Sequence, residues 1–263
     1  MASQVSDQQV NAIVQKVIAE LRAKPTTVTM TVVAHPERSI APSKAHPERS
    51  EAESKDAAQL GDGIFADIDS AVTAARKAYE QLDQMTLAKR KEIIAAVRVE
   101  MIQRAEELAK MAHSETGLGR WQDKVKKNLL CAEKTPGPEF LEPITWTGDH
   151  GLTLMERARY GVVAAITPTT NPTSTIINNS IGILSAGNAA VFNVHPNAKR
   201  VSAYQIQLIN RTIVRAGGPP NLIAGVAEPT IESAQALMRH RLARILLVTG
   251  GPGVVQEAMK SGK

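Results

Sequence analysis

The sequence has 263 residues, of which 43% are hydrophobic and 22% charged, so it is long enough to bury a core. A single cysteine excludes a disulfide framework and a cysteine-rich zinc site, and no stretch approaches the ~20 apolar residues of a membrane span. The net charge of +5 would suit nucleic acid, but basic residues are interspersed with acidic ones and aromatics make up only 3%. We therefore expect a cytoplasmic protein with an aliphatic core that binds neither nucleic acid nor a membrane.

Residues 1–24 are predicted to form a separate amphipathic helix. Ser6 and Gln9 have the spacing of a capping box at its start, and Pro25 ends it. Its apolar residues recur at spacings of three and four, which places them on one face: Val10, Ile13, Val14, Val17, Ile18 and Leu21. A narrow apolar stripe of this kind favours docking into a groove of a partner protein, with self-association or packing on the body as alternatives.

Residues 25–61 are predicted to form a flexible linker because they are rich in Pro, Ser, Thr, Glu and Lys and offer little to bury. The linker holds a tandem repeat, in which residues 34–44 and 45–55 agree at nine of eleven positions. Each copy carries one histidine, His35 and His46. Without nearby thiolates or clustered carboxylates these make a poor metal site, so we expect a duplicated spacer and no bound metal.

Residues 62–263 are predicted to form the globular body. Apolar residues at helical spacing predict helices over 67–85, 87–113 and 121–134. Residues 141–160 are predicted to form a small antiparallel unit. Beyond them, short apolar runs alternate with helical segments, which predicts strands at 162–167, 189–194, 222–227 and 245–249 and helices at 172–185, 198–216, 230–240 and from about 252. This alternation indicates an α/β fold with a parallel sheet covered on both faces, whose ligands bind at the carboxyl ends of the strands.

The turns after these strands carry the candidate site residues. Asn171 directly precedes a helix, where its amide could either cap the helix or donate to a developing oxyanion. His195 follows the second strand and could contact a ribose or phosphate, or serve as a cap. The glycine-rich turn 249–253 leads into the last helix and would allow a phosphate to approach backbone amides, although its spacing is not that of a known phosphate loop. Cys131 lies in an aliphatic helical context and is predicted to be a packed, unreactive thiol.

The body resembles the CoA-acylating aldehyde dehydrogenases of bacterial microcompartments, the acetaldehyde and propionaldehyde dehydrogenase type. The resemblance extends over nearly all of residues 62–263. The motifs that carry it are ETGLGR at 115–120, DKVKKN at 123–128, KTPG at 134–137, GLTL at 151–154, ITPTTNPTST at 166–175, NSIG at 179–182, AGNA at 186–189, FNVHPNAK at 192–199 and VTGG at 248–251. It implies that residues 62–263 are an aldehyde dehydrogenase-like NAD-binding domain with a Rossmann-type sheet.

The resemblance also implies a reaction: a cysteine thiolate attacks a short-chain aldehyde, hydride passes to NAD, and coenzyme A takes the acyl group. Asn171 matches the family's oxyanion-binding asparagine, and Thr167, Pro168, Thr169 and Thr170 match the segment beside the nicotinamide. His195 and Pro196 match the strand end near the adenosine. The positions that match the adenosine and pyrophosphate side are Gly225, Thr249, Gly250, Gly251 and Val254.

The resemblance implies three further expectations. The family's catalytic cysteine lies C-terminal to the last helix of this chain and does not match Cys131, so we expect this chain to be a truncated form that is inactive alone; a cofactor-binding or shell-docking fragment is the alternative. The N-terminal helix and linker resemble encapsulation peptides, so residues 5–22 are expected to dock on a shell protein in the microcompartment lumen. The full-length protein is expected to be a homo-oligomer.

Overall fold

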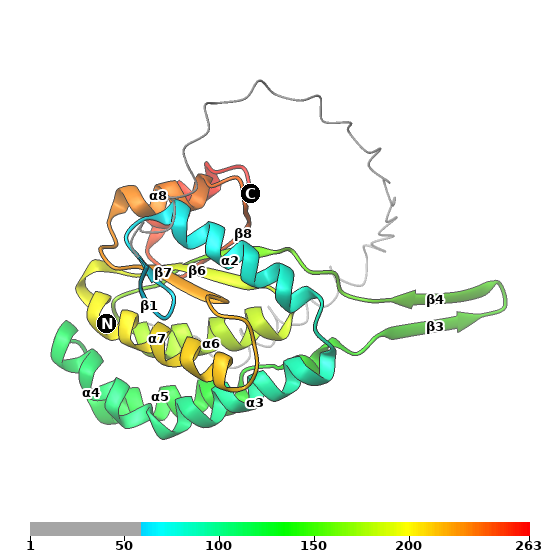
Figure 1. Cartoon of the computed structure of the whole chain (residues 1–263), viewed down its shortest axis with the longest axis horizontal. Coiled ribbons are helices and arrows are strands. Elements are labelled where there is room, and N and C mark those ends of the chain that lie inside the picture. Colours follow the sequence, from blue (N-terminus) through cyan, green and yellow to red (C-terminus); the bar gives the residue numbers. More distant parts are fainter. Residues whose placement is uncertain (1–58) are drawn as a thin grey trace, which may run out of the picture. The chain divides into compact units, whose positions relative to one another are not determined.

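The computed structural model describes residues 59–263, and the helix and repeat expected within residues 1–58 lie outside the described part. Its body is a sheet with helices on both faces (Figure 1). The sheet has the strand order β1-β2-β7-β6-β5-β8 and is parallel from β2 to β8. The strands are β1 (Gln59–Gly61), β2 (Ile64–Phe65), β5 (Val162–Ile166), β6 (Ala189–Asn193), β7 (Ile223–Val226) and β8 (Ala243–Val248). The predicted α/β class is confirmed.

The central strands of the sheet form a core that is built almost entirely from aliphatic side chains. Every residue of β5, β6 and β7 is buried, as expected for parallel strands covered on both faces. Phe192 is the one aromatic among the largest fully buried side chains in the described part, and the others are Leu, Ile and Met. The small side chains of Ala164, Ala165, Ala189 and Ala190 let helices approach the sheet closely.

Two helical layers cover one face of the sheet. Helices α6 (Pro172–Ser185) and α7 (Lys199–Arg215) lie next to the sheet, and α3 (Leu87–Gln103), α4 (Ala105–Thr116) and α5 (Trp121–Lys134) pack outside them. The opposite face carries α2 (Ile68–Asp83) and α8 (Ile231–Arg239), and α9 (Pro252–Met259) packs on β8 beside α8. Among residues 59–263, two short 3-10 turns, η1 (Pro138–Leu141) and η2 (Pro196–Ala198), complete the elements.

The prediction of a single helix over residues 87–113 is wrong, because the structure divides it at Arg104 into α3 and α4. Arg104 has φ −94° and ψ 5°, outside helical geometry, and its guanidinium bonds Glu100 on α3 and Glu107 on α4. The buried positions nevertheless keep helical spacing across the break, from Val97 and Met101 to Ala105. The apolar pattern is therefore continuous where the helix is not.

The amino-terminal edge of the sheet was also not predicted. Gln59–Gly61, the end of the expected linker, forms β1 and pairs antiparallel with β2, which in turn pairs parallel with β7. Asp62 has φ 47° and Gly63 φ 92°, so a tight turn joins the two strands. Strands of three and two residues are too short to give a periodic signal, which explains why the sequence did not reveal them.

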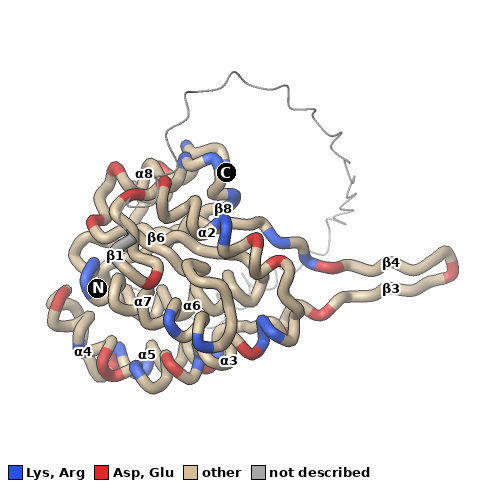
Figure 2. The backbone as a smooth tube through the Cα atoms, in the orientation of Figure 1, with Lys and Arg blue, Asp and Glu red and all other residues tan. Residues whose placement is uncertain are grey.

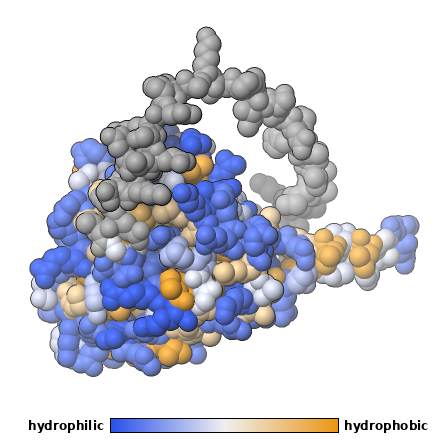
Figure 3. Space-filling view, in the orientation of Figure 1, coloured by the Kyte–Doolittle hydropathy of each residue, from blue (hydrophilic) through white to orange (hydrophobic). Residues whose placement is uncertain are grey.

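Residues 141–160 contain the predicted antiparallel unit, a hairpin of β3 (Ile144–Gly148) and β4 (Gly151–Met155). Every residue of both strands is exposed, including Trp146, Leu152 and Leu154. The hairpin projects from the body in Figure 1, and Figure 3 shows apolar side chains along it.

Charge is spread over the described part: Figure 2 shows basic and acidic residues interspersed along the helices, without a continuous basic stripe in that view. No helix among residues 59–263 is long and apolar enough to cross a membrane.

Candidate functional site

The strand order places a topological switch point at the carboxyl edge of the sheet, and we call this edge the crevice. From β5 the chain passes through α6 to β6 on one side, and it later returns through α8 to β8 on the other side of β5. The loops after β5 and β8 therefore diverge, and such switch points are where open α/β sheets bind ligands. Two backbone bonds fix these loops: Thr249 N donates to the Ile166 carbonyl at 3.0 Å, and Thr167 N to the Asn193 carbonyl at 3.4 Å.

The loop after β5 offers two buried hydroxyls. The side-chain oxygens of Thr167 and Thr169 are buried and have no hydrogen-bond partner among the described residues. A buried polar atom without a partner costs free energy, so these two hydroxyls distinguish the loop after β5 as a candidate for ligand contact. Pro168 between them is half-buried, and Thr170 is exposed.

Asn171 does not cap α6 with its side chain, although it occupies the N-cap position. Its Oδ1 accepts from Lys127 Nζ at 3.0 Å, and its backbone carbonyl accepts from the Thr175 hydroxyl at 2.7 Å. An ammonium can only donate, so the oxygen of the amide must face Lys127 and the NH2 group is turned the other way. Of the two roles that spacing left open for this amide, side-chain capping is the one that the structure contradicts.

Helix α5 supplies two lysines to the loop after β5, and the sequence did not assign either one to the site. Lys124 is buried and donates from Nζ to the Thr170 carbonyl at 2.7 Å, while Lys127 bonds Asn171. Burial, and then the charge of Lys127, lowers the pKa of Lys124. The spacing of 124, 127 and 128 on a predicted helix places these residues on one face, and that signal would have drawn attention to them.

Asn128 ties the lysine-bearing helix to the core. It is fully buried, its Nδ2 donates to the Ala105 carbonyl at 3.0 Å, and its Oδ1 accepts from the Thr173 hydroxyl at 2.9 Å. One side chain thus joins α4, α5 and the first turn of α6. The position of Lys127 relative to Asn171 follows from this connection.

His195 follows β6 and is half-buried. Its Nδ1 accepts from Asn197 N at 3.2 Å, so the ring caps η2, which is one of the two readings that spacing allowed. Pro196 is exposed beside it. Both residues lie at the same carboxyl edge as the loop after β5, because β5 and β6 are parallel and in register.

Gly225 lies inside β7 and is enclosed by the core. A Cβ at this position would lie 2.9 Å from Ile206 Cδ1 and 3.3 Å from the Phe192 carbonyl oxygen. Packing between the strand and α7 therefore accounts for a glycine here. The structure does not bring Gly225 into the crevice as an exposed residue.

The turn after β8 leads into α9 through Thr249, Gly250 and Gly251, all exposed. A Cβ on Gly250 would lie 2.4 Å from Val254 Cγ1, so a larger residue would displace the first turn of the helix. A Cβ on Gly251 would meet nothing within 4 Å, which leaves open space before the amides of α9. Backbone NH groups at a helix start favour a phosphate in such a position.

Cys131 lies on α5, half-buried against the hydrophobic core. Burial raises the pKa of its thiol. A protonated, packed thiol is a poor nucleophile, in agreement with the prediction that this residue is unreactive.

Comparison with known proteins assigns the family. Residues 41–263 match the sequence model of the aldehyde dehydrogenase family. The acetylating acetaldehyde dehydrogenase of Bilophila wadsworthia is 42% identical over 258 residues, which cover 97% of this chain and 49% of that protein. The chain therefore belongs to the aldehyde dehydrogenase family, and it spans about half the length of the curated relatives it matches.

Solved structures agree with this assignment. The propionaldehyde dehydrogenase from the fucose utilisation microcompartment of Clostridium phytofermentans is 46% identical with a TM-score of 0.74, covering 76% of this chain and 46% of that one. The propionaldehyde dehydrogenase of Rhodopseudomonas palustris, solved with bound CoA and an acylated cysteine, is 43% identical with a TM-score of 0.75, covering 78% of this chain and 47% of that one. The resemblance to acylating aldehyde dehydrogenases is confirmed.

Proposed function

We propose that this chain is the nucleotide-binding part of an enzyme that oxidises acetaldehyde or propionaldehyde to the corresponding acyl-CoA with NAD. The observation that carries the proposal is the amide of Asn171, held by Lys127 beside the unpartnered hydroxyls of Thr167 and Thr169 at the crevice. The names of the relatives supply the reaction class, and these side chains supply a place for it.

The proposed nucleotide site uses both loops of the crevice. Residues 167–170 lie beside the nicotinamide, and His195 and Pro196 lie near the adenosine. The pyrophosphate approaches the open space at Gly251 and the first amides of α9, with Thr249, Gly250 and Val254 around it. Gly225 is proposed to support the adenosine side indirectly, because it allows β7 to pack closely and does not itself contact the nucleotide. Bound NAD supplies a hydride acceptor.

Asn171 is proposed to act on the aldehyde rather than on the nucleotide. Its NH2 group, turned away from Lys127, would donate to the carbonyl oxygen as negative charge develops there when a thiolate adds to the carbon. Fixing the amide before reaction avoids reorganisation during the step.

Cys131 is not proposed as that thiolate. It is the one cysteine of the sequence, half-buried, and its pKa is raised. We therefore expect these 263 residues by themselves to form no NADH from propionaldehyde and CoA. If no NADH forms, the function of these 263 residues is that of a cofactor-binding or shell-docking fragment, which is the alternative proposal.

The microcompartment context of one solved relative supports the proposal that residues 5–22 dock on a shell protein and that the chain resides in the lumen. Coenzyme A is proposed as the acyl acceptor, and a homo-oligomer as the assembly of the full-length protein. Residues 5–22 lie outside the described part, so the apolar stripe of the sequence carries the docking proposal.

Calorimetric titration of the 263-residue chain with NAD tests the nucleotide site. We expect saturable binding that Thr167→Val weakens, because the isosteric methyl cannot replace the hydroxyl. Asn171→Ala serves as the control. It should leave the affinity for NAD within about two-fold, because the amide of Asn171 is proposed to contact the aldehyde oxygen and not the nucleotide. Absence of saturable binding in a folded chain would overturn the proposal.

A further inference from the structure

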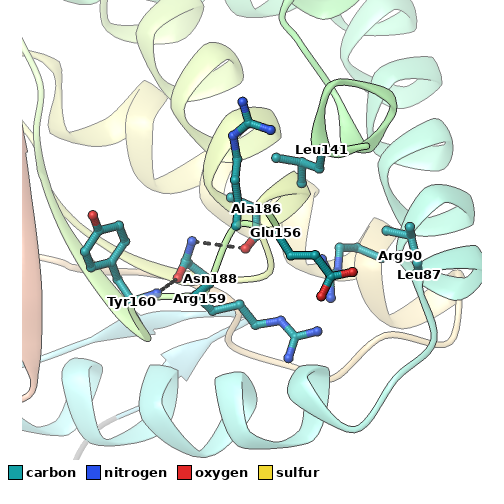
Figure 4. Close-up of a pocket in the computed structure, with 10 residues that line it drawn as sticks. Leu87, Arg90, Leu141, Glu156, Arg159, Tyr160, Ala186 and Asn188 are labelled. Atoms are coloured by element: carbon teal, nitrogen blue, oxygen red, sulfur yellow. Dashed lines mark hydrogen bonds between the residues drawn. The ribbon is translucent and has the colours of Figure 1, made fainter. Parts of the chain in front are cut away.

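A cavity lies at the opposite edge of the sheet from the crevice. It encloses about 630 Å³ and is lined by residues 156–160, which precede β5, by Ala186 and Asn188, which precede β6, and by Leu87, Arg90 and Leu141 (Figure 4). Because β5 and β6 are parallel, segments that precede them mark the amino edge. A cavity of this size falls in the range of small-molecule sites.

The lining of this cavity is strongly basic. Three arginines, Arg90, Arg157 and Arg159, and one carboxylate, Glu156, line the cavity. Arg159 is paired with Asp83 on α2, so part of its charge is already balanced. Arg90 makes one bond from its guanidinium, from Nη1 to the Ser185 carbonyl at 3.3 Å, and no ion pair with any described residue.

The burial of Arg90 points to the same kind of ligand. The residue is only 5% exposed, and its Nε is buried without a partner among the described residues. Burial, and then the charge of Arg159, lowers the pKa of Arg90, and the charge of Asp83 opposes them. A buried guanidinium with an unused donor is costly unless an anion accompanies it.

Gly187 allows the two guanidinium groups to approach each other. It has φ +75°, and a Cβ there would lie 3.0 Å from Arg90 Cζ and 2.8 Å from Arg159 Nε. Any side chain would therefore crowd both arginines. Two guanidinium groups brought together repel each other, and the single carboxylate of Asp83, which pairs with Arg159 and acts on Arg90, balances only one of the two charges. The planar fork of arginine matches the oxygens of phosphate and carboxylate.

We propose that this cavity is an anion-binding site, separate from the nucleotide crevice, which takes a small molecule through its phosphate or carboxylate group. Arg90 and Arg159 form the base of the site, and the exposed Arg157 closes over the ligand from the segment before β5. Inorganic phosphate and malonate serve as probes for the two kinds of oxyanion.

The test is calorimetric titration of the 263-residue chain with each probe, with sodium chloride adjusted to hold the ionic strength constant. We expect saturable binding of at least one probe, and the tighter one identifies the group recognised. Arg157→Gln should weaken binding by about ten-fold, as expected for loss of a charge-assisted hydrogen bond. The matched control is Arg211→Gln, which removes the same charge from an exposed residue of α7 and should change the affinity by less than about two-fold.

Arg90→Lys keeps the positive charge but loses the planar guanidinium, so this variant should also weaken binding of the probe. Circular dichroism checks that the variant folds. If it does not fold, the comparison of Arg157→Gln with Arg211→Gln still tests the site. Three outcomes would overturn the proposal. They are no saturable binding of either probe, equal losses in Arg157→Gln and Arg211→Gln, and displacement of the probe by NAD with no effect of Arg157→Gln, which would place the anion in the crevice.

Discussion

At the residue scale, the roles of single side chains depend on neighbours far away in the sequence. The sequence showed Asn171 before a helix, but only the fold places Lys127 of α5 against its Oδ1. Likewise the turn at Thr167 was visible, whereas the lack of partners for its buried hydroxyl was not. Contacts across 44 positions of sequence cannot be read from local spacing.

Asn128→Ala should destabilise the protein by about 2–4 kcal/mol, because it leaves the Ala105 carbonyl and the Thr173 hydroxyl without their buried partner. Urea denaturation measures the change. Gln122→Ala, exposed on the same helix, is the control and should stay within about 0.5 kcal/mol of wild type. Equal stability of the two variants would mean that Asn128 does not tie the helices together.

Cys131 should be alkylated slowly at neutral pH. Burial raises the pKa of its thiol, so the protonated form persists to higher pH than in a free thiol. Because the thiolate is the form that reacts, the alkylation rate of Cys131 should rise at higher pH than the alkylation rate of glutathione. Iodoacetamide labelling followed by mass spectrometry gives the pH profile. A rate at pH 7 above that of glutathione would contradict the assignment of Cys131 as unreactive.

At the element scale, long periodic segments were predictable and short ones were not. The helices α5 and α6 begin and end where the sequence predicted, since Pro136 and Pro172 mark their limits. The break at Arg104 could not be predicted because it leaves the apolar periodicity unchanged. Strand β2 could not be predicted because it has only two residues. Periodicity therefore reports which residues face the core, while breaks and short edge strands depend on tertiary packing.

Ser233→Ala should destabilise α8 and its attachment to β6. Ser233 Oγ accepts from Thr230 N at 2.8 Å in a capping box, and it also bonds Asn193 Oδ1. The expected loss is about 1–2 kcal/mol in urea denaturation, as for other helix caps. Thr73→Ala, exposed on α2, is a control for the loss of a hydroxyl. A loss no larger than that of the control would exclude the capping role.

At the scale of the whole molecule, two opposite edges of one sheet serve the two proposed sites. The carboxyl edge holds Thr167 and Asn171, whereas the amino edge holds Arg90 and Gly187. The parallel sheet, predicted from the alternation of strands and helices, fixes this separation. The resemblance of the sequence supplied the candidate residues of the first site, and the second arises from side chains that only the fold brings together.

The exposed hairpin should promote self-association of the chain. Trp146, Leu152 and Leu154 are 52%, 67% and 58% exposed, and exposed apolar surface of this kind favours contact with another molecule. Replacing Leu152 and Leu154 with Ser should shift the sedimentation distribution toward monomer. An unchanged distribution in the variant would show that other surfaces dominate association.

Nitrogen-15 NMR titration of the labelled chain with NAD tests whether the nucleotide binds at the carboxyl edge of the sheet. We expect the backbone amide signals of residues 167–171 and 249–254 to shift with one common affinity. The amide signals of residues 156–160 and 186–188, at the opposite edge, should not shift. Shifts confined to the opposite edge, or none in either loop at saturating NAD, would contradict a nucleotide site at the carboxyl edge of the sheet.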